Sequence, residues 1–526
     1  MQLRSLRTAL CCITMLCGAT AAQAQYDLII RGGRLLDGMG NPWRYADVAI
    51  VGAQIVVVGD LKAATANRVI DAAGFYVAPG FIDVHTHAGT GLASADLSHA
   101  RPLLAQGITT VVINPDGGGP TDIEGQRRRL LEHGLGVNVA QLVPQGTVRE
   151  AVLQMDDRDP TDEELDRMRS IVRQGMAAGA FGLSSGLYYA PGSYATTEEV
   201  IELAKVVAEF DGVYQSHIRD EADYNIGVVA AVEEVIRIAR EARLPGIVTH
   251  IKALGPRVWG FSTAIVQRIE RARAQGVEVF ADQYPYDASG TSITGALIPR
   301  WAQVGGQRAL LARLDSAEVR TRIRAAIVEN LDRRGGAGRL QFQRHEADPT
   351  IEGRTLQAVA DERGMQPADL AMALLRAGGA GVVSFNMHDD DVATFMRQSW
   401  TMTSSDGDIT KMGEGVPHPR WYGTFPRKIR KYVLDDATIS LETAIRSMTS
   451  LSANVMRIPH RGVIMPGAAA DIVVFDLERI RDKATYEDPH QLCEGMEFVL
   501  VNGRIAVDGG EFTAEMGGRV LTRGQP

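Results

Sequence analysis

The sequence predicts an α/β protein in which a (β/α)8 TIM-like barrel carries a small β-sandwich domain built from both chain ends. Two observations support this fold class. Through the middle of the chain, short apolar runs alternate with amphipathic helical stretches, which is typical of a parallel barrel. At the two ends, residues 25–79 and 459–526, strand-like runs are separated by glycine turns, and a domain made from both ends would pair them.

Residues 1–24 are expected to lie outside this fold as a signal peptide. Arg4 and Arg7 form a short basic start, residues 9–21 are apolar but too short to cross a bilayer with margin, and residues 22–24 (AQA) have the small-x-small pattern of a cleavage site. We therefore expect a periplasmic or secreted protein. An uncleaved membrane anchor is the competing interpretation.

The exported chain would keep a single cysteine. Three of the four cysteines precede residue 25, so only Cys493 remains and no intrachain disulfide can form. Stability must then come from a large core.

No other stretch reaches 18 uncharged apolar residues, so we expect no membrane association after signal cleavage. The net charge of −9 argues against nucleic acid as a partner, because such proteins need a basic face.

The predicted barrel spans residues 80–458, and eight short apolar runs that end in polar residues are interpreted as its strands. Helical patterns at 163–178, 197–209 and 225–241 lie between them. From about 299 to 367 the chain is rich in arginine and helical with no clear strand, so we expect an insertion or lid there. The eight runs are 109–113, 137–143, 182–185, 213–217, 246–250, 277–283, 381–385 and 402–405.

Four histidines lie at the ends of predicted strands. His85 and His87 are two residues apart, so in a strand both imidazoles point to the same side. His217 and His250 end two further runs. Each of these histidines alone is more often structural. In a barrel, however, the C-terminal ends of the strands form the face that carries the active site. The chain has only 11 histidines, so four of them at strand ends are hard to explain by chance. We therefore expect them to bind a metal ion.

Two aspartates follow predicted strands on the same face. Asp406 lies just past the last strand, where a carboxylate can bind metal and accept a proton from water. Asp116 follows the run 109–113 and precedes three glycines. Asp-Gly pairs are also common in turns, and that is the alternative interpretation of both positions.

The order of these residues resembles that of the amidohydrolase superfamily, and more closely that of the N-acyl-D-amino-acid deacylases (D-aminoacylases). The resemblance covers nearly the whole chain after residue 24. Each local match is weak alone, but together and in this order they are specific. The matching motifs are AFGLSSGLYYAPG (180–192), SHIRDE (216–221), HIKA (250–253), QYPY (283–286), SDG (405–407), HPRWYGTFPR (418–427) and RGVIMPGAAADIVVFD (461–476).

This resemblance implies a barrel of the metal-dependent hydrolase type, with one or two zinc ions. It also implies hydrolysis of an N-acyl-D-amino acid to a carboxylate and a free D-amino acid. It assigns His85, His87 and Asp406 to one metal position and His217 and His250 to the other. Asp406 would in addition be catalytic, taking a proton from the attacking water and passing it to the leaving nitrogen.

Two positions depart from the family pattern. Asp116 stands where these deacylases typically carry a cysteine ligand, and a carboxylate is a harder ligand than a thiolate. Asp116 is kept as a candidate metal ligand, and the number and type of metal ions stay open. Gln145 stands where many members have a histidine, and it can donate a hydrogen bond but cannot titrate.

The substrate's α-carboxylate needs cationic or hydroxyl partners. The resemblance points to Lys252, Tyr284 and Arg420, and Arg219 is an additional candidate. In the family, the loop 287–297 helps to line the side-chain pocket, and here it carries no basic residue. We therefore expect a neutral or apolar D-residue to be favoured over D-Glu or D-Asp.

Other functions stay open at this point. A related hydrolase would act on dipeptides with a C-terminal D-residue, or on another amide or a lactone. Cyclic amidases are disfavoured, because they usually carry a carboxylated lysine at the end of the fourth strand and no lysine ends such a strand here. The non-enzyme alternative is a catalytically inactive ligand-binding homologue. In each case the partner is a small molecule, and the oligomeric state, including a homo-oligomer, is open.

Overall fold

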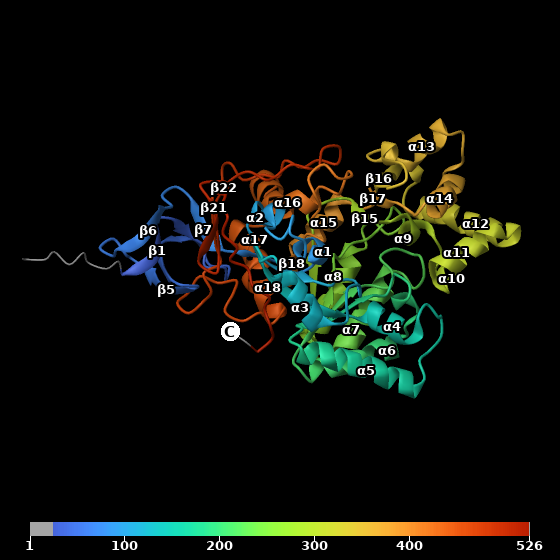
Figure 1. Ribbon diagram of the computed structural model, residues 1–526, viewed down its shortest axis with the longest axis horizontal. Coiled ribbons are helices and arrows are strands. Elements are labelled where there is room, and N and C mark those ends of the chain that lie inside the picture. The colour runs from blue at the N-terminus through green and yellow to red at the C-terminus, as the bar shows by residue number, and fades with distance from the viewer. Residues whose placement is uncertain (1–24, 525–526) are drawn as a thin grey trace, which may run out of the picture.

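The computed structural model describes residues 25–524, so the predicted signal peptide at 1–24 lies outside the described residues. Figure 1 shows three parts along the long axis of the molecule: sheets from both chain ends, then the barrel, then a segment of helices and a small sheet. No helix within residues 25–524 is long and apolar enough to cross a membrane.

The central part is a sheet of eight strands, all paired in parallel and following one another in chain order. Apolar side chains of these strands, among them Ile82, Val112 and Met402, share one buried cluster, which suits strands covered on both faces. The eight strands are β8 (Phe81–Asp83), β9 (Ile108–Ile113), β10 (Asn138–Pro144), β11 (Gly182–Gly186), β12 (Val213–His217), β13 (Gly246–Val248), β14 (Val279–Gln283) and β18 (Thr401–Thr403).

The two edge strands of this sheet, β8 and β18, approach each other just beyond their C-terminal ends. Thr86 and Gly407 form a parallel bridge. On either side of it, the backbone N–H of Asp406 donates to the His85 carbonyl at 2.9 Å and the N–H of His87 donates to the Gly407 carbonyl at 2.7 Å. The barrel is therefore nearly closed, and the predicted fold class is confirmed.

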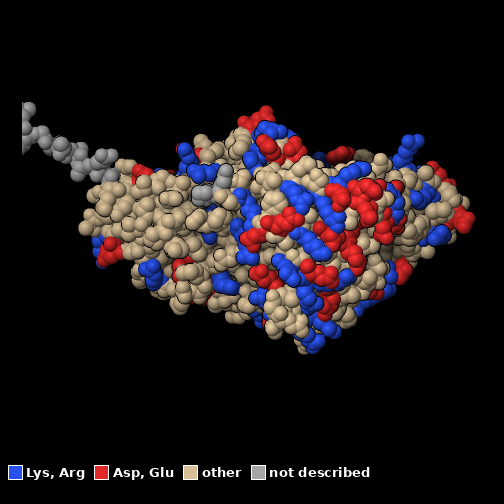
Figure 2. Space-filling view, turned by 90° about the horizontal axis from the view of Figure 1, so that it is seen from below, with Lys and Arg blue, Asp and Glu red and all other residues tan. Residues whose placement is uncertain are grey.

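Helices cover the outside of the barrel. α5 begins with a capping box between Thr161 and Glu164, and its acidic first turn complements the helix dipole. Figure 2 shows basic and acidic side chains interspersed on this face, where α5 and α6 are joined by ion pairs such as Arg173–Glu209 at 2.7 Å. The helices are α1 (Gly89–Leu92), α2 (Arg101–Leu104), α3 (Ile123–Leu131), α4 (Gln145–Leu153), α5 (Asp162–Ala177), α6 (Thr197–Ala208), α7 (Val228–Ala242), α8 (Ser262–Ala274), α15 (Asp389–Met396), α16 (Arg420–Arg427), α17 (Leu441–Met448) and α18 (Ser450–Val455).

One predicted barrel strand was assigned wrongly. The run 381–385 forms β17 (Gly381–Ser384), the middle strand of a separate antiparallel sheet with β15 (Ser289–Ser292) and β16 (Leu340–Arg344). The eighth barrel strand is β8 instead. A short buried β-rich run carries no information on its pairing partners, so its sheet cannot be deduced from periodicity.

The segment that leaves the barrel therefore runs from β15 to β17 and is wider than the expected 299–367. β16 lies inside the stretch that was expected to lack a strand. Six helices accompany the small sheet and enclose a core of their own (Figure 1). They are α9 (Ile293–Leu297), α10 (Arg300–Gln303), α11 (Gly306–Asp315), α12 (Ala317–Arg333), α13 (Leu356–Glu362) and α14 (Pro367–Arg376).

The chain ends form two further sheets that pack face to face. Leu28 and Val48 of one sheet share a buried cluster with Ile472 of the other. A second cluster joins Phe475 to Phe81 of the barrel, so no gap in packing marks the domain boundary, and the bounds 25–79 and 459–526 stay a prediction. One sheet contains β5 (Gln54–Gly59), β4 (Asp47–Val51), β1 (Tyr26–Arg31) and β6 (Ala66–Asp71); the other contains β22 (Glu511–Phe512), β21 (Arg504–Asp508), β20 (Met496–Val501), β19 (Ile472–Phe475), β7 (Tyr76–Pro79), β2 (Arg34–Leu35) and β3 (Arg44–Tyr45).

Candidate metal centre

All four predicted histidines lie at the C-terminal face of the barrel. His85 and His87 follow β8, His217 ends β12, and His250 lies two residues after β13. His85, His217 and His250 are buried, whereas the side chain of His87 is 41% exposed and borders the cavity described below. The imidazoles of His85 and His250 have ring centroids 5.0 Å apart, and those of His217 and His250 are 4.5 Å apart.

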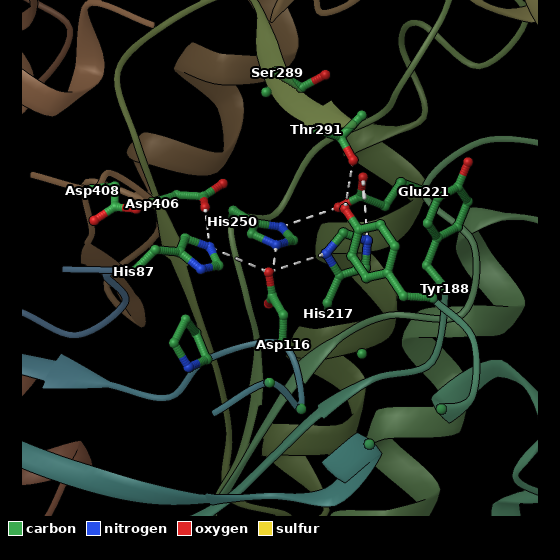
Figure 3. A pocket seen from close by; sticks show the side chains of 18 of the residues that line it. His87, Asp116, Tyr188, His217, Glu221, His250, Ser289, Thr291, Asp406 and Asp408 are labelled. Carbon is green, nitrogen blue, oxygen red and sulfur yellow. Dashed lines mark hydrogen bonds and ion pairs between the residues drawn. The ribbon is translucent and has the colours of Figure 1, made fainter. Parts of the chain in front are cut away.

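The carboxylate of Asp116 lies among these rings, and Figure 3 shows it between those of His87, His250 and His217. Its Oδ1 is 3.5 Å from His85 Nε2 and 3.6 Å from His250 Nε2. Its Oδ2 is 3.6 Å from His87 Nε2 and 3.7 Å from His217 Nδ1. Asp116 therefore faces all four histidines at once, two with each oxygen.

Asp406 faces the first pair of histidines from the other side. Its Oδ1 lies 3.5 Å from His85 Nε2 and 3.3 Å from His87 Nε2, and its Oδ2 lies 3.0 Å from Nη1 of Arg420. Burial alone would raise the pKa of Asp406, but Arg420 and then His250 outweigh burial and keep the pKa below its ordinary value. The Asp406 carboxylate is consequently ionised.

Three of these side chains are aimed by unusual backbone conformations. Asp116, His250 and Asp406 have φ of 55°, 35° and 46°, in the left-handed region that residues other than glycine rarely adopt. Gly117 follows Asp116 with φ of 69°, and a Cβ there would lie 2.9 Å from the backbone nitrogens of Gly146 and Gly186. Such backbone strain costs free energy and persists only where the surrounding structure fixes it. Strained residues of this kind are concentrated at functional sites.

The chemistry of this cluster fits bound zinc. Both ring nitrogens of His85 and of His217, and Oδ1 of Asp116, are buried without a hydrogen-bond partner in residues 25–524. Buried polar atoms are normally satisfied, so such a group of orphaned atoms calls for an ion. At zinc–ligand bonds of about 2.0–2.1 Å, tetrahedral donor atoms lie about 3.3–3.4 Å apart, close to the separations given above.

Two ligand groups are present, and they share one residue. His85, His87, Asp116 and Asp406 form one group, and Asp116, His217 and His250 form the other. Since Asp116 offers a different oxygen to neighbouring rings, its carboxylate is suited to bridge two ions.

Comparisons with known proteins agree with this geometry. A model of the amidohydrolase family matches residues 68–507. The chain is 35% identical over 521 residues to D-aminoacylase of Alcaligenes xylosoxydans xylosoxydans, which covers 95% of this chain and 98% of that protein. It is also 35% identical over 529 residues to N-acyl-D-aspartate deacylase of the same organism, covering 96% of each.

The chain belongs to the N-acyl-D-amino-acid deacylase family of the amidohydrolases. A solved structure of N-acyl-D-glutamate deacylase from Bordetella bronchiseptica, complexed with zinc and a phosphonate inhibitor that mimics the tetrahedral intermediate, has a TM-score of 0.81 at 33% identity, covering 94% of this chain and 99% of that one. The predicted family and zinc as cofactor are confirmed. Relatives named for three different substrates are almost equally similar, so overall identity does not select the side chain.

Glu221 contacts two of the candidate metal ligands of this amidohydrolase and was missed in the sequence. Its Oε1 lies 3.0 Å from His250 Nδ1 and accepts a hydrogen bond from Lys252 Nζ at 2.5 Å, and its Oε2 lies 3.9 Å from His217 Nε2 (Figure 3). Burial would raise the pKa of Glu221, but Lys252 and the two imidazoles keep it below the ordinary range. Its position four residues after His217 in the SHIRDE motif was the available signal.

A cavity of about 490 Å³ opens beside the candidate metal ligands. Lys252, Tyr284 and Arg420 line it as expected, and all three are at least 96% buried. The guanidinium of Arg420 lies over the Tyr284 ring, 4.5 Å from its centroid, and Lys252 Nζ is 5.7 Å from the same centroid. The three side chains thus form one wall. Tyr188, Ser289, Arg334 and Gln343 also line the cavity and were not identified from the sequence.

Arg219 does not belong to this wall, and its assignment to substrate binding was wrong. Its guanidinium donates to both carboxylate oxygens of Glu234 and to the backbone carbonyls of Ser193 and Ala195. These bonds hold the loop before α6 against α7. The guanidinium donors therefore bind groups of the protein outside the cavity.

Gln145, at the position where many relatives carry a histidine, is fully buried beneath the loop that carries Asp116. Its amide nitrogen donates to Glu199 at 3.4 Å, and Glu199 is also bound by Arg149. The amide is therefore part of a buried polar network and is not among the residues lining the cavity.

Proposed function

We propose that this chain hydrolyses the amide bond of N-acyl-D-amino acids, releasing a carboxylate and a free D-amino acid. The observation that carries the proposal is the position of Asp116 between two pairs of histidines, with Asp406 across one pair and a cavity alongside. The family relatives named for this reaction support it.

Zinc bound by these ligands would polarise the acyl carbonyl and lower the pKa of a bound water. The chain's own contribution starts with Asp406. Its carboxylate is ionised and borders the cavity, so it can accept a proton from the attacking water and return it to the leaving nitrogen. His85, His87, His217, His250 and Asp116 would serve as metal ligands.

Arg420, Lys252 and Tyr284 are proposed to hold the α-carboxylate of the substrate. Arg420 lines the cavity and its guanidinium carries a fixed positive charge, so it is suited to bind a substrate carboxylate. Lys252 adds positive charge and Tyr284 a buried hydroxyl on the same wall. Anchoring this end of the substrate fixes the scissile amide relative to Asp406, and such orientation lowers the barrier to reaction.

The decisive experiment is an assay of released amine with zinc-loaded protein. The substrates are matched N-acetyl-D- and N-acetyl-L-amino acids, together with dipeptides that end in a D-residue. We expect hydrolysis of the N-acetyl-D compounds and its loss in Asp406→Asn, with bound zinc retained. Asp96→Asn, which removes a surface ion pair with Lys411, is the matched control.

The other outcomes separate the alternatives. Faster cleavage of the dipeptides would favour a dipeptidase. Metal-free protein that binds these compounds without releasing amine would favour the inactive binding protein.

We propose in addition that the chain is exported after removal of residues 1–24. Support comes from the basic start, the short apolar run and the AQA cleavage pattern. Expression of the full chain in a Gram-negative host tests this. N-terminal sequencing of the periplasmic protein should start at Gln25, and recovery of the full-length chain in the membrane fraction would support the anchor instead.

A further inference from the structure

Arg334 is a buried cation in the wall of the active-site cavity. It follows the last residue of α12, in the segment that leaves the barrel, and it is 2% exposed. Its Nε donates to the backbone carbonyl of Ala296 at 3.2 Å. Its Nη1 donates to the amide oxygen of Asn386 at 3.1 Å when that amide is oriented to satisfy its neighbours.

All of these partners are neutral. The rings of Tyr188 and Tyr224 lie beside the guanidinium, which is 5.8 Å from the centroid of Tyr224. No carboxylate in residues 25–524 forms an ion pair with Arg334. The other two cations of the cavity differ, since Lys252 is paired with Glu221 at 2.5 Å and Arg420 with Asp406 at 3.0 Å.

A buried guanidinium without an anion is costly, because it loses its hydration and stays charged at any physiological pH. Buried charges are normally paired, so an anionic ligand would supply the partner that Arg334 lacks. The α-carboxylate of the proposed substrate already has Lys252, Tyr284 and Arg420. Arg334 is the cation of this wall that has no carboxylate partner within residues 25–524, so it is available to a second anionic group of the substrate.

We infer that Arg334 binds a second carboxylate on the substrate, the side chain of an acidic D-residue such as D-aspartate or D-glutamate. This inference rests on the proposed function. It replaces the expectation of a neutral or apolar residue, which considered only the loop 287–297. That loop carries no basic side chain, but its Ala296 carbonyl fixes Arg334, which enters the cavity from a different part of the chain.

The first test uses the intact zinc enzyme and isosteric pairs of substrates: N-acetyl-D-glutamate against N-acetyl-D-glutamine, and N-acetyl-D-aspartate against N-acetyl-D-asparagine. Within each pair only the side-chain charge differs. We expect kcat/KM to be higher for the acid by about 100-fold. Equal values, or a preference for the amides, would overturn the inference while the proposed function stands. If none of the four is hydrolysed and neutral N-acetyl-D-amino acids are also inert, the proposed function itself fails.

The second test is Arg334→Met, which keeps an unbranched apolar stem in place of the arginine side chain but removes the guanidinium and its charge. We expect kcat/KM for N-acetyl-D-glutamate to fall about 100-fold, with the glutamine analogue changed less than about threefold. Arg334→Lys should keep part of the activity on the acid. Arg333→Gln is the matched control, because this neighbour pairs with Glu329 and Asp223 outside the cavity.

A loss of the same size on the acid and the amide would contradict the inference, since it would mean that Arg334 holds the α-carboxylate or only the fold. Circular dichroism and bound zinc verify that each variant is folded. If Arg334→Met does not fold, the preference measured on the wild type decides.

Discussion

Nη1 of Arg420 lies 3.0 Å from Oδ2 of Asp406, and both side chains are buried at the mouth of the barrel. The pair joins the proposed proton acceptor to the proposed anchor of the substrate. Arg420 is the first residue of α16, and a long loop separates this helix from β18, so the guanidinium reaches the candidate metal ligands only in the folded chain.

Arg420→Met should lower kcat/KM for any N-acyl-D-amino acid by about 100- to 1000-fold, because it removes a carboxylate partner and leaves Asp406 without its cation. KM should rise and kcat should fall together. Arg420→Lys should be intermediate, since an ammonium lacks the guanidinium fork. Steady-state kinetics measure this, with Arg430→Gln, an exposed partner of Asp435, as the control. Kinetics of Arg420→Met within threefold of the wild type would refute the role.

Glu221→Gln should weaken zinc binding by about 10- to 100-fold, because groups that orient ligating histidines have effects of this size. The substitution removes the charge that faces His250 and Lys252 but keeps the side-chain volume. Competition with a chromophoric chelator gives the zinc Kd. Glu241→Gln on α7 removes a surface ion pair with Arg237 and should leave the Kd unchanged. An unaltered Kd in Glu221→Gln would show that its contacts do not support the site.

Asp116→Ala should lower the metal content of the purified protein from about two ions per chain to about one, since one ligand group keeps three residues without Asp116 and the other keeps only His217 and His250. Asp116→Cys should recover part of it, because a thiolate also binds zinc. Elemental analysis after dialysis measures the content, with Asp96→Asn as the control. If Asp116→Ala and the wild type bind the same amount of metal with the same Kd, Asp116 is not a ligand.

The sequence was most informative where function depends on strand ends. A polar residue that closes an apolar run is visible in the sequence, and barrel topology brings all such ends to one face. His85, His87, His217 and His250 could therefore be grouped before any coordinates. Asp116 and Asp406 could be assigned to this face, but the direction of their side chains could not be predicted. That direction depends on a left-handed backbone conformation, which is set by the packing of the glycine-rich loops around them.

Residues that act from outside the strand ends could not be found in this way. Arg334 follows α12 in an arginine-rich helical segment, and nothing in its neighbours along the chain distinguishes it from Arg333, which pairs with acids outside the cavity. The same limit explains the error at β17, whose pairing partners lie about 40 and 90 residues away in the chain. The position of Arg334 in the cavity wall and the pairing of β17 depend on long-range contacts and not on the local sequence pattern.

A buried lysine outside the cavity, Lys428, makes stability depend on pH. Lys428, where a π-helical segment (Lys428–Asp435) continues α16, is 2% exposed and forms no ion pair within residues 25–524. Its Nζ donates to the hydroxyls of Thr403 and Ser447, both at 2.8 Å. Burial lowers the pKa of Lys428 to about 7, whereas in the unfolded chain a lysine titrates near pH 10.

Between these two pKa values the unfolded chain binds the additional proton, so the free energy of unfolding should rise as the pH increases from 7 to 10, and the full penalty should apply below pH 7. Lys428→Met should therefore stabilise the protein by about 2–3 kcal/mol at pH 7 or below, after allowing for the lost hydrogen bonds, and this gain should shrink towards pH 10. Chemical denaturation of the zinc-bound protein at several pH values measures both curves. Lys431→Met, whose partner Asp436 is accessible, is the control. Parallel curves for Lys428→Met and the wild type would mean that the lysine stays charged inside the protein.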